Sequence, residues 1–188
     1  MLLIRLEELL KSIDLQKKVI QNIKKGSIFI YPTDTVYGLG CDAQIVRAVR
    51  KLRELKRAEH PLSVIAPSIE WIKRNFEIKF PSYFKLLPGP YTLILKKKDP
   101  DFLKWVSHTD SLGIRIPDHY FTVFVQRARV PFVTTSVNVS GRPYAKDIHE
   151  VDQSILKGVD VIIDAGRLEG KPSKIIDLTG SEPKVIRE

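Results

Sequence analysis

The chain has 188 residues, of which 43% are hydrophobic and 28% charged, and 31 Lys and Arg against 22 Asp and Glu give a net charge of +9. This length and composition predict one globular domain over residues 1–188 and exclude a disordered chain. A membrane protein is excluded because no apolar run approaches the roughly 18 residues of a membrane-spanning helix. The positive charge favours an anionic partner such as a nucleotide, pyrophosphate or RNA.

The first half of the chain alternates between helical and strand patterns. An amphipathic helix is expected over Asp14–Lys25 with Gly26 as its C-cap, followed by a strand of β-branched and aromatic residues over Ser27–Tyr31. A second helix is expected over Ala43–Arg57, and it must end before His60-Pro61. Four further elements are expected: a strand at Leu62–Ala66, short helices at Ser68–Asn75 and Pro81–Leu87, and a strand at Tyr91–Lys97.

The second half continues the alternation and adds strands without helices between them. We expect a helix over His119–Arg129 with Asp118 as its N-cap, and a last helix over Asp147–Lys157. The expected strands are Ser111–Ile116, Pro131–Val137, Val159–Asp164, Ser173–Leu178 and Lys184–Ile186. Interleaved helices and strands predict an α/β domain, and the direct strand-to-strand joins near the C-terminus predict a mixed sheet.

The most unusual stretch follows the first expected strand and reads PTDTVYGLG. It combines hydroxyl groups, one carboxylate and two glycines: Thr33, Asp34, Thr35, Tyr37, Gly38 and Gly40. A loop that only reversed the chain would need one Gly or Pro, whereas glycines also allow a backbone to approach a ligand closely. Strand ends of this kind hold ligands in α/β folds. The alternative is a polar turn that happens to be rich in threonine.

Other polar residues lie where strands and helices are expected to end. Arg115 lies inside a strand, where a buried guanidinium needs a carboxylate or phosphate partner. Ser136 and Asn138 end another strand, while Lys56 and Arg57 end a helix. If these groups converge, they form a basic cleft for a polyphosphate and a small carboxylate. It is equally open at this point that Arg115 pairs with an internal Asp and that the segment after Ser136 is a turn.

Several common sites have no counterpart in the sequence. There is no phosphate-binding GxxxxGK[ST] loop, no GxGxxG, no GxSxG and no Cys/His pattern with metal-ligand spacing, so no metal site is predicted. The four histidines are scattered, which is typical of surface or capping positions. The one cysteine, Cys41, is expected to be a small buried residue in a reducing compartment. The N-terminus lacks a signal-peptide cleavage site, so we expect a cytoplasmic protein.

The segments PTDTVYGLGCDA, LPGPYTLIL, LGIRIPDH, TTSVNVSGRP and VIIDAG occur in this order over about residues 14–187. Together they resemble the YrdC family of threonylcarbamoyl-AMP synthases. The resemblance implies a twisted, open, mixed sheet flanked by helices, with a basic concave face. It also implies a nucleotidyltransferase that uses L-threonine, bicarbonate and ATP with Mg²⁺ and releases pyrophosphate. The threonylcarbamoyl-adenylate product would pass to a tRNA threonylcarbamoyltransferase complex that modifies tRNA at position 37.

The same resemblance implies roles for residues of these motifs. Arg115 would bind the threonine carboxylate with a bidentate fork. The implied substrate-binding residues are Thr33, Thr35, Arg115, Thr134 and Ser173. The implied nucleotide-binding residues are Lys56, Arg57, Ser111, Ser136, Asn138 and Arg187. Four of these would be catalytic: Lys56, Arg57, Ser136 and Asn138.

Three positions depart from the family pattern, and one is the Ser-Thr after the late glycine-rich stretch, which is Ser173-Lys174 here. The family usually has Lys-x-Arg ahead of Pro-Leu, whereas this chain reads ELKRAEHPLS. Direct counting aligns Glu54 and Lys56 with that pair, a one-residue deletion selects Lys56 and Arg57, and Arg53 is a further candidate. Ile65 stands where some members use a histidine for threonine. These changes resemble the YciO-like branch and imply an alternative, an RNA-binding module of translation or ribosome assembly that binds double-stranded RNA on the basic face.

Overall fold

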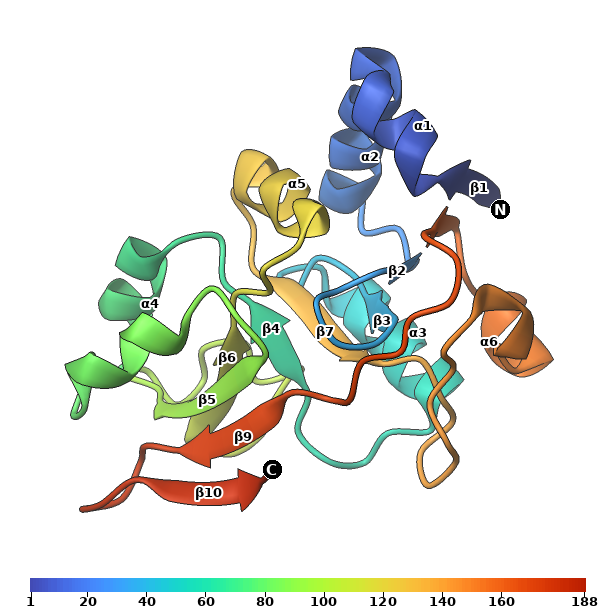
Figure 1. The fold of residues 1–188 in the computed structure, drawn as a ribbon. Helices are drawn as coiled ribbons and strands as arrows, with labels where there is room; N and C mark the ends of the chain where they lie inside the picture. Colours follow the sequence, from blue (N-terminus) through green and yellow to red (C-terminus); the bar gives the residue numbers. More distant parts are fainter.

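The computed structural model describes residues 1–188 and is built around one open sheet of ten strands (Figure 1). The strands are β1 (Leu2–Arg5), β2 (Phe29–Tyr31), β3 (Gly38–Gly40), β4 (Ser63–Ile65), β5 (Tyr91–Lys96), β6 (Ser111–Arg115), β7 (Phe132–Ser136), β8 (Val161–Asp164), β9 (Lys174–Asp177) and β10 (Lys184–Arg187). Their spatial order is β1-β8-β2-β3-β7-β4-β6-β5-β9-β10. Pairs such as β4–β6 are parallel and pairs such as β4–β7 antiparallel, so the predicted mixed sheet is confirmed.

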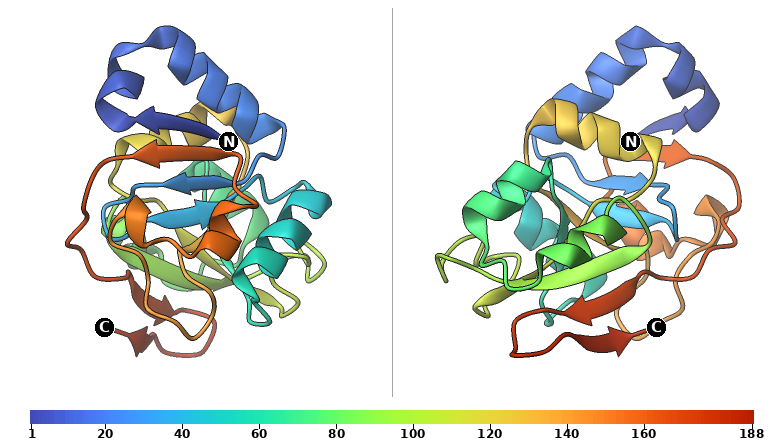
Figure 2. Two further views of the ribbon diagram at one scale, coloured as in Figure 1. Left: turned by 90° about the vertical axis from the view of Figure 1, so that its right-hand side faces the viewer. Right: turned by 60° about the vertical axis from the view of Figure 1, so that its left-hand side comes forward.

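Helices cover the sheet on both faces. They are α1 (Leu6–Lys11), α2 (Ile13–Lys24), α3 (Val46–Lys56), α4 (Ile69–Asn75), α5 (Tyr120–Ala128), α6 (Gln153–Leu156) and the 3₁₀ turns η1 (Pro81–Leu86) and η2 (Ile148–Glu150). A core of 32 buried residues lies between one face and α3, α4 and α6, while a smaller core of 14 lies between the other face and α1, α2 and α5. Figure 2 shows α1, α2 and α5 gathered at one end of the molecule and β9 and β10 at the other. None of the helices combines the length and apolar character that crossing a membrane requires.

Alternation along the strands assigns each side chain to one of these faces. In β2, Phe29 and Tyr31 enter the smaller core and Ile30 the larger one; in β7, Phe132 and Val133 divide in the same way. The next residue of β7 on the Phe132 face is Thr134, which no helix covers. The smaller core therefore occupies only part of its face, and polar side chains occupy the remainder.

Two glycines explain how β2, β3 and β7 pack so closely. A Cβ atom on Gly38 would lie 2.6 Å from Cζ of Tyr31, and one on Gly40 would collide with the carbonyl oxygen of Val133. Both glycines pair with β2 inside β3, opposite Tyr31 and Phe29. Both glycines therefore lie in a strand and not in the predicted loop, and both make room for protein neighbours. Gly38 also lines the cleft described below, as a glycine that lets a ligand approach would.

Several predicted boundaries are wrong for local reasons. The expected helix over Asp147–Lys157 is broken into η2 and α6, because Asp147 and Asp152 each cap a separate turn through their side chains. The N-cap of α5 is not Asp118 but His119, whose Nδ1 accepts a hydrogen bond from the Phe121 amide. The strands β1 and β3 and the helix α1 were not predicted. The C-cap of α2 is Lys25, and the predicted Gly26 follows it with a positive φ, the position after a helix that favours glycine.

Candidate functional site

A polar cleft of about 260 Å³ lies beside the smaller core, on the part of that sheet face that α1, α2 and α5 leave uncovered. Strands β3, β4, β5, β6, β7, β9 and β10 and the C-terminal end of α3 contribute to its lining. The cationic side chains among these residues are Lys56, Arg115 and Arg187, with His60 beside them, and none of the lining residues is acidic. The cleft therefore favours an anionic ligand.

Arg115 is a buried cation of the cleft and is 7% exposed. Its Nη2 donates to Asp34 Oδ1 at 2.7 Å and to Thr35 Oγ1 at 3.3 Å, while Asp34 Oδ2 accepts from the Asp118 amide. Burial lowers the pKa of Arg115, and the Asp34 carboxylate opposes that effect. An internal Asp is thus one partner of Arg115, as the alternative held. Nε of Arg115 nevertheless is buried without a hydrogen-bond partner, so the guanidinium retains a donor for a ligand.

Lys56 is buried at the end of α3 and uses all three of its protons within the protein. Its Nζ donates to the Ser136 carbonyl at 2.8 Å, to the Asn138 carbonyl at 3.1 Å and to Asn138 Oδ1 at 2.9 Å. Burial lowers the pKa of Lys56 to about 8. Lys56 therefore fixes the turn after β7 and contributes positive charge without a proton left over for a direct ligand contact.

The turn that Lys56 fixes is also held by its own side chains. Ser136 Oγ donates to Asn138 Oδ1 at 2.6 Å, and Asn138 Nδ2 donates to the carbonyls of Val139 and Arg142. The predicted Ser136 and Asn138 do line the cleft together with Lys56. The segment after Ser136 is thus both a turn and a wall of the site.

Ser140 also lines the cleft, although it was not among the predicted site residues. Its amide donates to the Lys56 carbonyl at 2.9 Å, which places its side chain at the cleft. Its Oγ is buried and lacks a hydrogen-bond partner, like Nε of Arg115. Gly141 follows with a φ of +83°. A hydroxyl next to such a glycine, two residues beyond Asn138, is the signal in the sequence for this position.

Ser173 and Arg187 close the opposite side of the cleft. Arg187 donates to the Ser173 carbonyl from Nε at 2.9 Å and from Nη2 at 2.6 Å, and Ser173 Oγ lies 2.8 Å from Thr92 Oγ1. A register shift between Val185 and Arg187 turns the arginine toward the cleft. Burial and the nearby Arg115 lower the pKa of Arg187.

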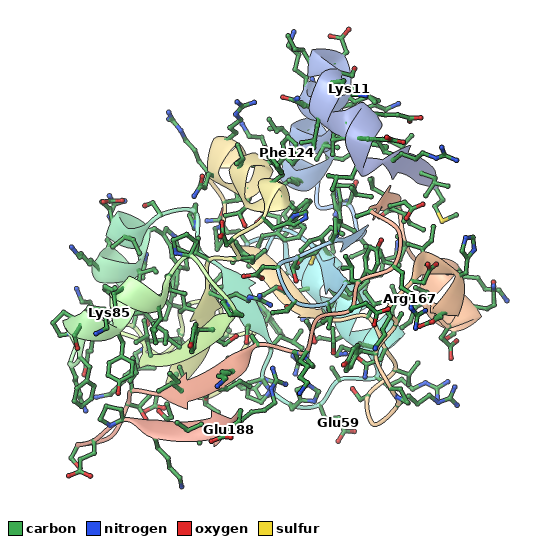
Figure 3. The ribbon with its side chains drawn as sticks, viewed as in Figure 1. Lys11, Glu59, Lys85, Phe124, Arg167 and Glu188 are labelled. Atoms are coloured by element: carbon green, nitrogen blue, oxygen red, sulfur yellow. The ribbon has the colours of Figure 1, made fainter.

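The segment linking β8 to β9, residues 165–173, forms one more wall. Pro172 lines the cleft, and Gly170 approaches the Thr35 carbonyl so closely that a Cβ atom would collide with it. Arg167, labelled in Figure 3, holds this segment through an ion pair with Glu150 at 2.6 Å. The walls are therefore fixed by contacts that do not involve a ligand.

Thr33 and Thr35 lie at the Arg115 end of the cleft and are bonded to each other. Thr33 Oγ1 donates to the Val36 carbonyl at 2.7 Å, accepts from the Thr35 amide and lies 2.9 Å from Thr35 Oγ1. Thr33 lines the cleft, whereas Thr35 lies behind it against Arg115. Thr134, on β7, also lines the cleft.

Besides Thr35, the structure leaves three candidates and the departing position Ile65 outside the cleft lining. Arg57 is exposed with a φ of +53°, and Ser111, at the far end of β6, bonds to Thr109. Arg53 donates to the carbonyls of Glu59 and His60, and Ile65 is fully buried in the smaller core. The predicted Lys56–Arg57 pair is therefore divided, because α3 ends between them and turns Arg57 away.

Neither a reactive cysteine nor a cluster of metal ligands is found outside the cleft. Burial raises the pKa of the Cys41 thiol, and Cys41 is fully buried in the larger core. No group of three or more His, Cys, Asp or Glu side chains is arranged to hold a metal ion. A wider groove of about 820 Å³ runs between α4 and α5, but it is lined mainly by apolar and proline residues and contains none of the cationic groups.

A family model and a curated protein that resemble this chain point to the same family. A family model for the Sua5/YciO/YrdC domain, described as "Telomere recombination", matches residues 21–188. A putative threonylcarbamoyl-AMP synthase of Methanocaldococcus jannaschii is 38% identical over 191 residues, which cover 92% of this chain and 86% of that protein.

Two solved structures share the whole fold. Pyrococcus abyssi Sua5 in complex with L-threonine has a TM-score of 0.84 and 27% identity, covering 99% of this chain but 56% of its own. Escherichia coli YciO has a TM-score of 0.81 and 26% identity, covering 100% of this chain and 94% of its own. The chain thus spans about half the length of the Pyrococcus protein and nearly all of YciO.

Proposed function

The chain belongs to the Sua5/YciO/YrdC family, and on that premise we propose that it is an ATP-dependent threonylcarbamoyl-AMP synthase. In this reaction the amine of L-threonine attacks carbon of bicarbonate with loss of water and forms a carbamate. A carbamate oxygen then bonds to the α-phosphorus of ATP while the bond to pyrophosphate breaks. The observation that carries the proposal is the cationic cleft without a carboxylate, in which Arg115 keeps an unused Nε.

The two ends of the cleft suit the two anionic parts of this reaction. Nε of Arg115 and the hydroxyl of Thr134 are donors for the threonine carboxylate, and the Pyrococcus relative was solved with L-threonine. Ser140, Arg187 and the charge of Lys56 are suited to the ATP phosphates. No side chain here needs to act as a nucleophile, because positioning and charge neutralisation accelerate such a reaction.

Magnesium would enter this site with the nucleotide. The lining offers Mg²⁺ no carboxylate, and the ion prefers oxygen ligands, so the ATP phosphates and water would supply its coordination. The cleft volume of about 260 Å³ is below the roughly 300–1,000 Å³ of most ligand pockets. The base and ribose would therefore project beyond the cleft.

The proposed product is a reactive mixed anhydride and needs an acceptor. We propose that a tRNA threonylcarbamoyltransferase complex transfers the threonylcarbamoyl group to tRNA at position 37, in the cytoplasm. The basic surface of the chain would bring that polyanion or its carrier near the cleft.

The direct test is to measure AMP and pyrophosphate with and without L-threonine and bicarbonate. We expect turnover that requires both, and a loss of at least about 100-fold in Arg115→Ala and Asn138→Ala, since each removes a group that organises the transition state. Arg74→Ala, an exposed arginine at the end of α4, is the control and should retain activity. Release of pyrophosphate that does not depend on L-threonine, or full activity in Arg115→Ala, would contradict the proposal.

A second candidate function rests on the exposed face of α3. Arg47, Arg50 and Lys51 are exposed there, and Arg50 lies 4.3 Å from the ring centroid of the half-exposed Trp105. Cationic and aromatic groups together are typical of nucleic-acid surfaces. An RNA-binding module without synthase activity would bind RNA at this face and leave ATP unchanged.

A further inference from the structure

Tyr31 reaches across a neighbouring strand to a residue of the cleft. It belongs to β2, whereas its partner Thr134 belongs to β7, and β3 lies between them in the sheet. The ring passes over Gly38, the one position of β3 where any side chain would block it. It is stacked on Phe121 at 4.0 Å between centroids, so its position is fixed by packing. The phenol therefore reaches a defined point directly behind Thr134, which lines the cleft.

The direction of the hydrogen bond between these residues follows from burial. The Tyr31 hydroxyl lies 2.7 Å from Thr134 Oγ1, and Tyr31 is fully buried without another partner. If Thr134 donated, the phenolic proton would be left in an apolar core without an acceptor, which is unfavourable. Burial also raises the pKa of Tyr31, so the phenol keeps its proton. Tyr31 is the donor, and Thr134 must direct its own proton elsewhere.

Thr134 differs in this respect from the other two threonines of the site. The proton of Thr33 goes to the Val36 carbonyl, so in the 2.9 Å contact between the two threonines Thr35 must be the donor. Thr35 Oγ1 also accepts from Arg115. The hydroxyl protons of Thr33 and Thr35 are thus used, whereas that of Thr134 faces the cleft without an acceptor in the protein.

Strand register places this free proton on the same face as Arg115. Thr134 is level with Ser63 of β4, which is level with Gly113 of β6, and Arg115 follows two residues later. Residues two apart on a strand share a face, so Thr134 and Arg115 both project into the cleft. The free Thr134 proton and the unused Arg115 Nε are both donors, and a carboxylate offers two acceptors.

We propose that Tyr31 is a positioning residue for the substrate carboxylate: by donating to Thr134 it turns the threonine proton toward the cleft, where Thr134 and Arg115 Nε bind the carboxylate oxygens. The inference rests on the proposed function for the identity of the substrate. It assigns to Tyr31 a role in affinity for L-threonine and none in affinity for ATP.

The test is Tyr31→Phe, which keeps the ring stack on Phe121 and removes the hydroxyl alone. L-threonine binding is measured by calorimetry, and KM for threonine and ATP by pyrophosphate release. We expect threonine affinity to fall about fivefold, the effect of one hydrogen bond, with KM for ATP and kcat changed less than twofold. Tyr83→Phe is the matched control, because Tyr83 lies on η1 against Phe80 and away from the cleft.

A double-mutant cycle separates positioning from a general packing effect. Thr134→Val removes the hydroxyl that Tyr31 is proposed to orient, so Tyr31→Phe should then cause no further loss of threonine affinity. Equal threonine affinity in Tyr31→Phe and the unaltered protein, or additive losses in the double variant, would overturn the inference while leaving the synthase intact. An unaltered protein that neither binds L-threonine nor releases pyrophosphate would overturn both.

Discussion

At the scale of single residues, Lys56 combines a buried charge with a full set of acceptors. Two carbonyls and one side-chain amide surround its ammonium, so the charge is compensated by dipoles and not by a carboxylate. Such a lysine keeps a net positive potential in the cleft, which a salt bridge would cancel. Its lowered pKa is the cost of that arrangement.

This arrangement predicts that ATP binding depends on pH. As pH rises from 7 to 9, ATP affinity measured by calorimetry should fall with a midpoint near pH 8, where Lys56 loses its charge. Unfolding would not explain the loss. The unfolded chain holds this proton up to its usual pKa of 10.5, so between about pH 8 and 10.5 deprotonation of Lys56 favours the folded state. Lys56→Met should abolish the step, and a flat ATP affinity over this range would contradict the prediction.

The residues that sequence could predict were those with an unusual type for their position. An arginine within a strand and an Asn-containing turn after a strand are visible without a structure, and both Arg115 and Asn138 line the cleft. Tyr31 was not assigned, because an aromatic residue in a strand is ordinary locally, and Ser140 was given no role of its own although its motif was noted. The roles of both residues depend on the strand order and on which hydrogen-bonding groups the protein already uses.

At the scale of elements, the end of α3 decides which cation enters the cleft. The Arg57 and Ala58 amides bond to the Glu54 and Arg53 carbonyls, the pattern in which a helix is closed by a residue with positive φ. Arg57 occupies that position, usually reserved for glycine, and its side chain is exposed. The chain therefore turns between Lys56 and Arg57.

Arg57→Gly should consequently leave the protein active. Relief of the left-handed backbone strain should change the free energy of unfolding, measured by urea denaturation, by between zero and about +1 kcal/mol, because the flexibility of glycine in the unfolded chain offsets part of the gain. Pyrophosphate release should stay within twofold, whereas Lys56→Met should lose it. A folded but inactive Arg57→Gly would restore the predicted Lys56–Arg57 pair.

Helices with a long amphipathic pattern were predicted correctly, whereas strands that depend on partners distant in the sequence were missed. The helices α2, α3 and α5 carry amphipathic patterns that sequence alone reveals. By contrast, β3 is a Gly-Leu-Gly strand, and such a composition is unfavourable in strands unless neighbours fill the space. The strand β1 pairs with β8, and its sequence reads equally well as the start of the following helix. Whether these two segments form strands therefore depends on neighbouring strands that lie far away in the sequence.

At the scale of the whole molecule, two of the basic surfaces differ in how they present their charge. Lys56, Arg115 and Arg187 face the cleft, whereas much of the basic side of α3 faces solvent. The cleft suits a small anion because its cations are recessed and few. The α3 surface suits a polyanion because its cations are exposed and spaced along a helix.

Ligand binding at these two surfaces should differ in its dependence on salt concentration. Between 50 and 200 mM salt, ATP affinity is expected to fall less than about tenfold, since partly buried charges are screened weakly. RNA affinity at the α3 face should fall far more, by about 10³-fold if six phosphates are contacted. Arg47→Ala combined with Lys51→Ala should weaken RNA binding, measured by fluorescence anisotropy, and leave ATP binding unchanged. Equal salt dependence for both ligands would show that they share one surface.

The strand order also determines when the site can form as the chain is made. Leu2 of β1 pairs with Val161 of β8, and the cleft takes residues from β3 near the start of the sequence and from β9 and β10, which follow all other strands. Pairings of such long sequence separation have a high contact order and form slowly. A growing chain on the ribosome can therefore complete the cleft only after Ser173 and Arg187 have been added.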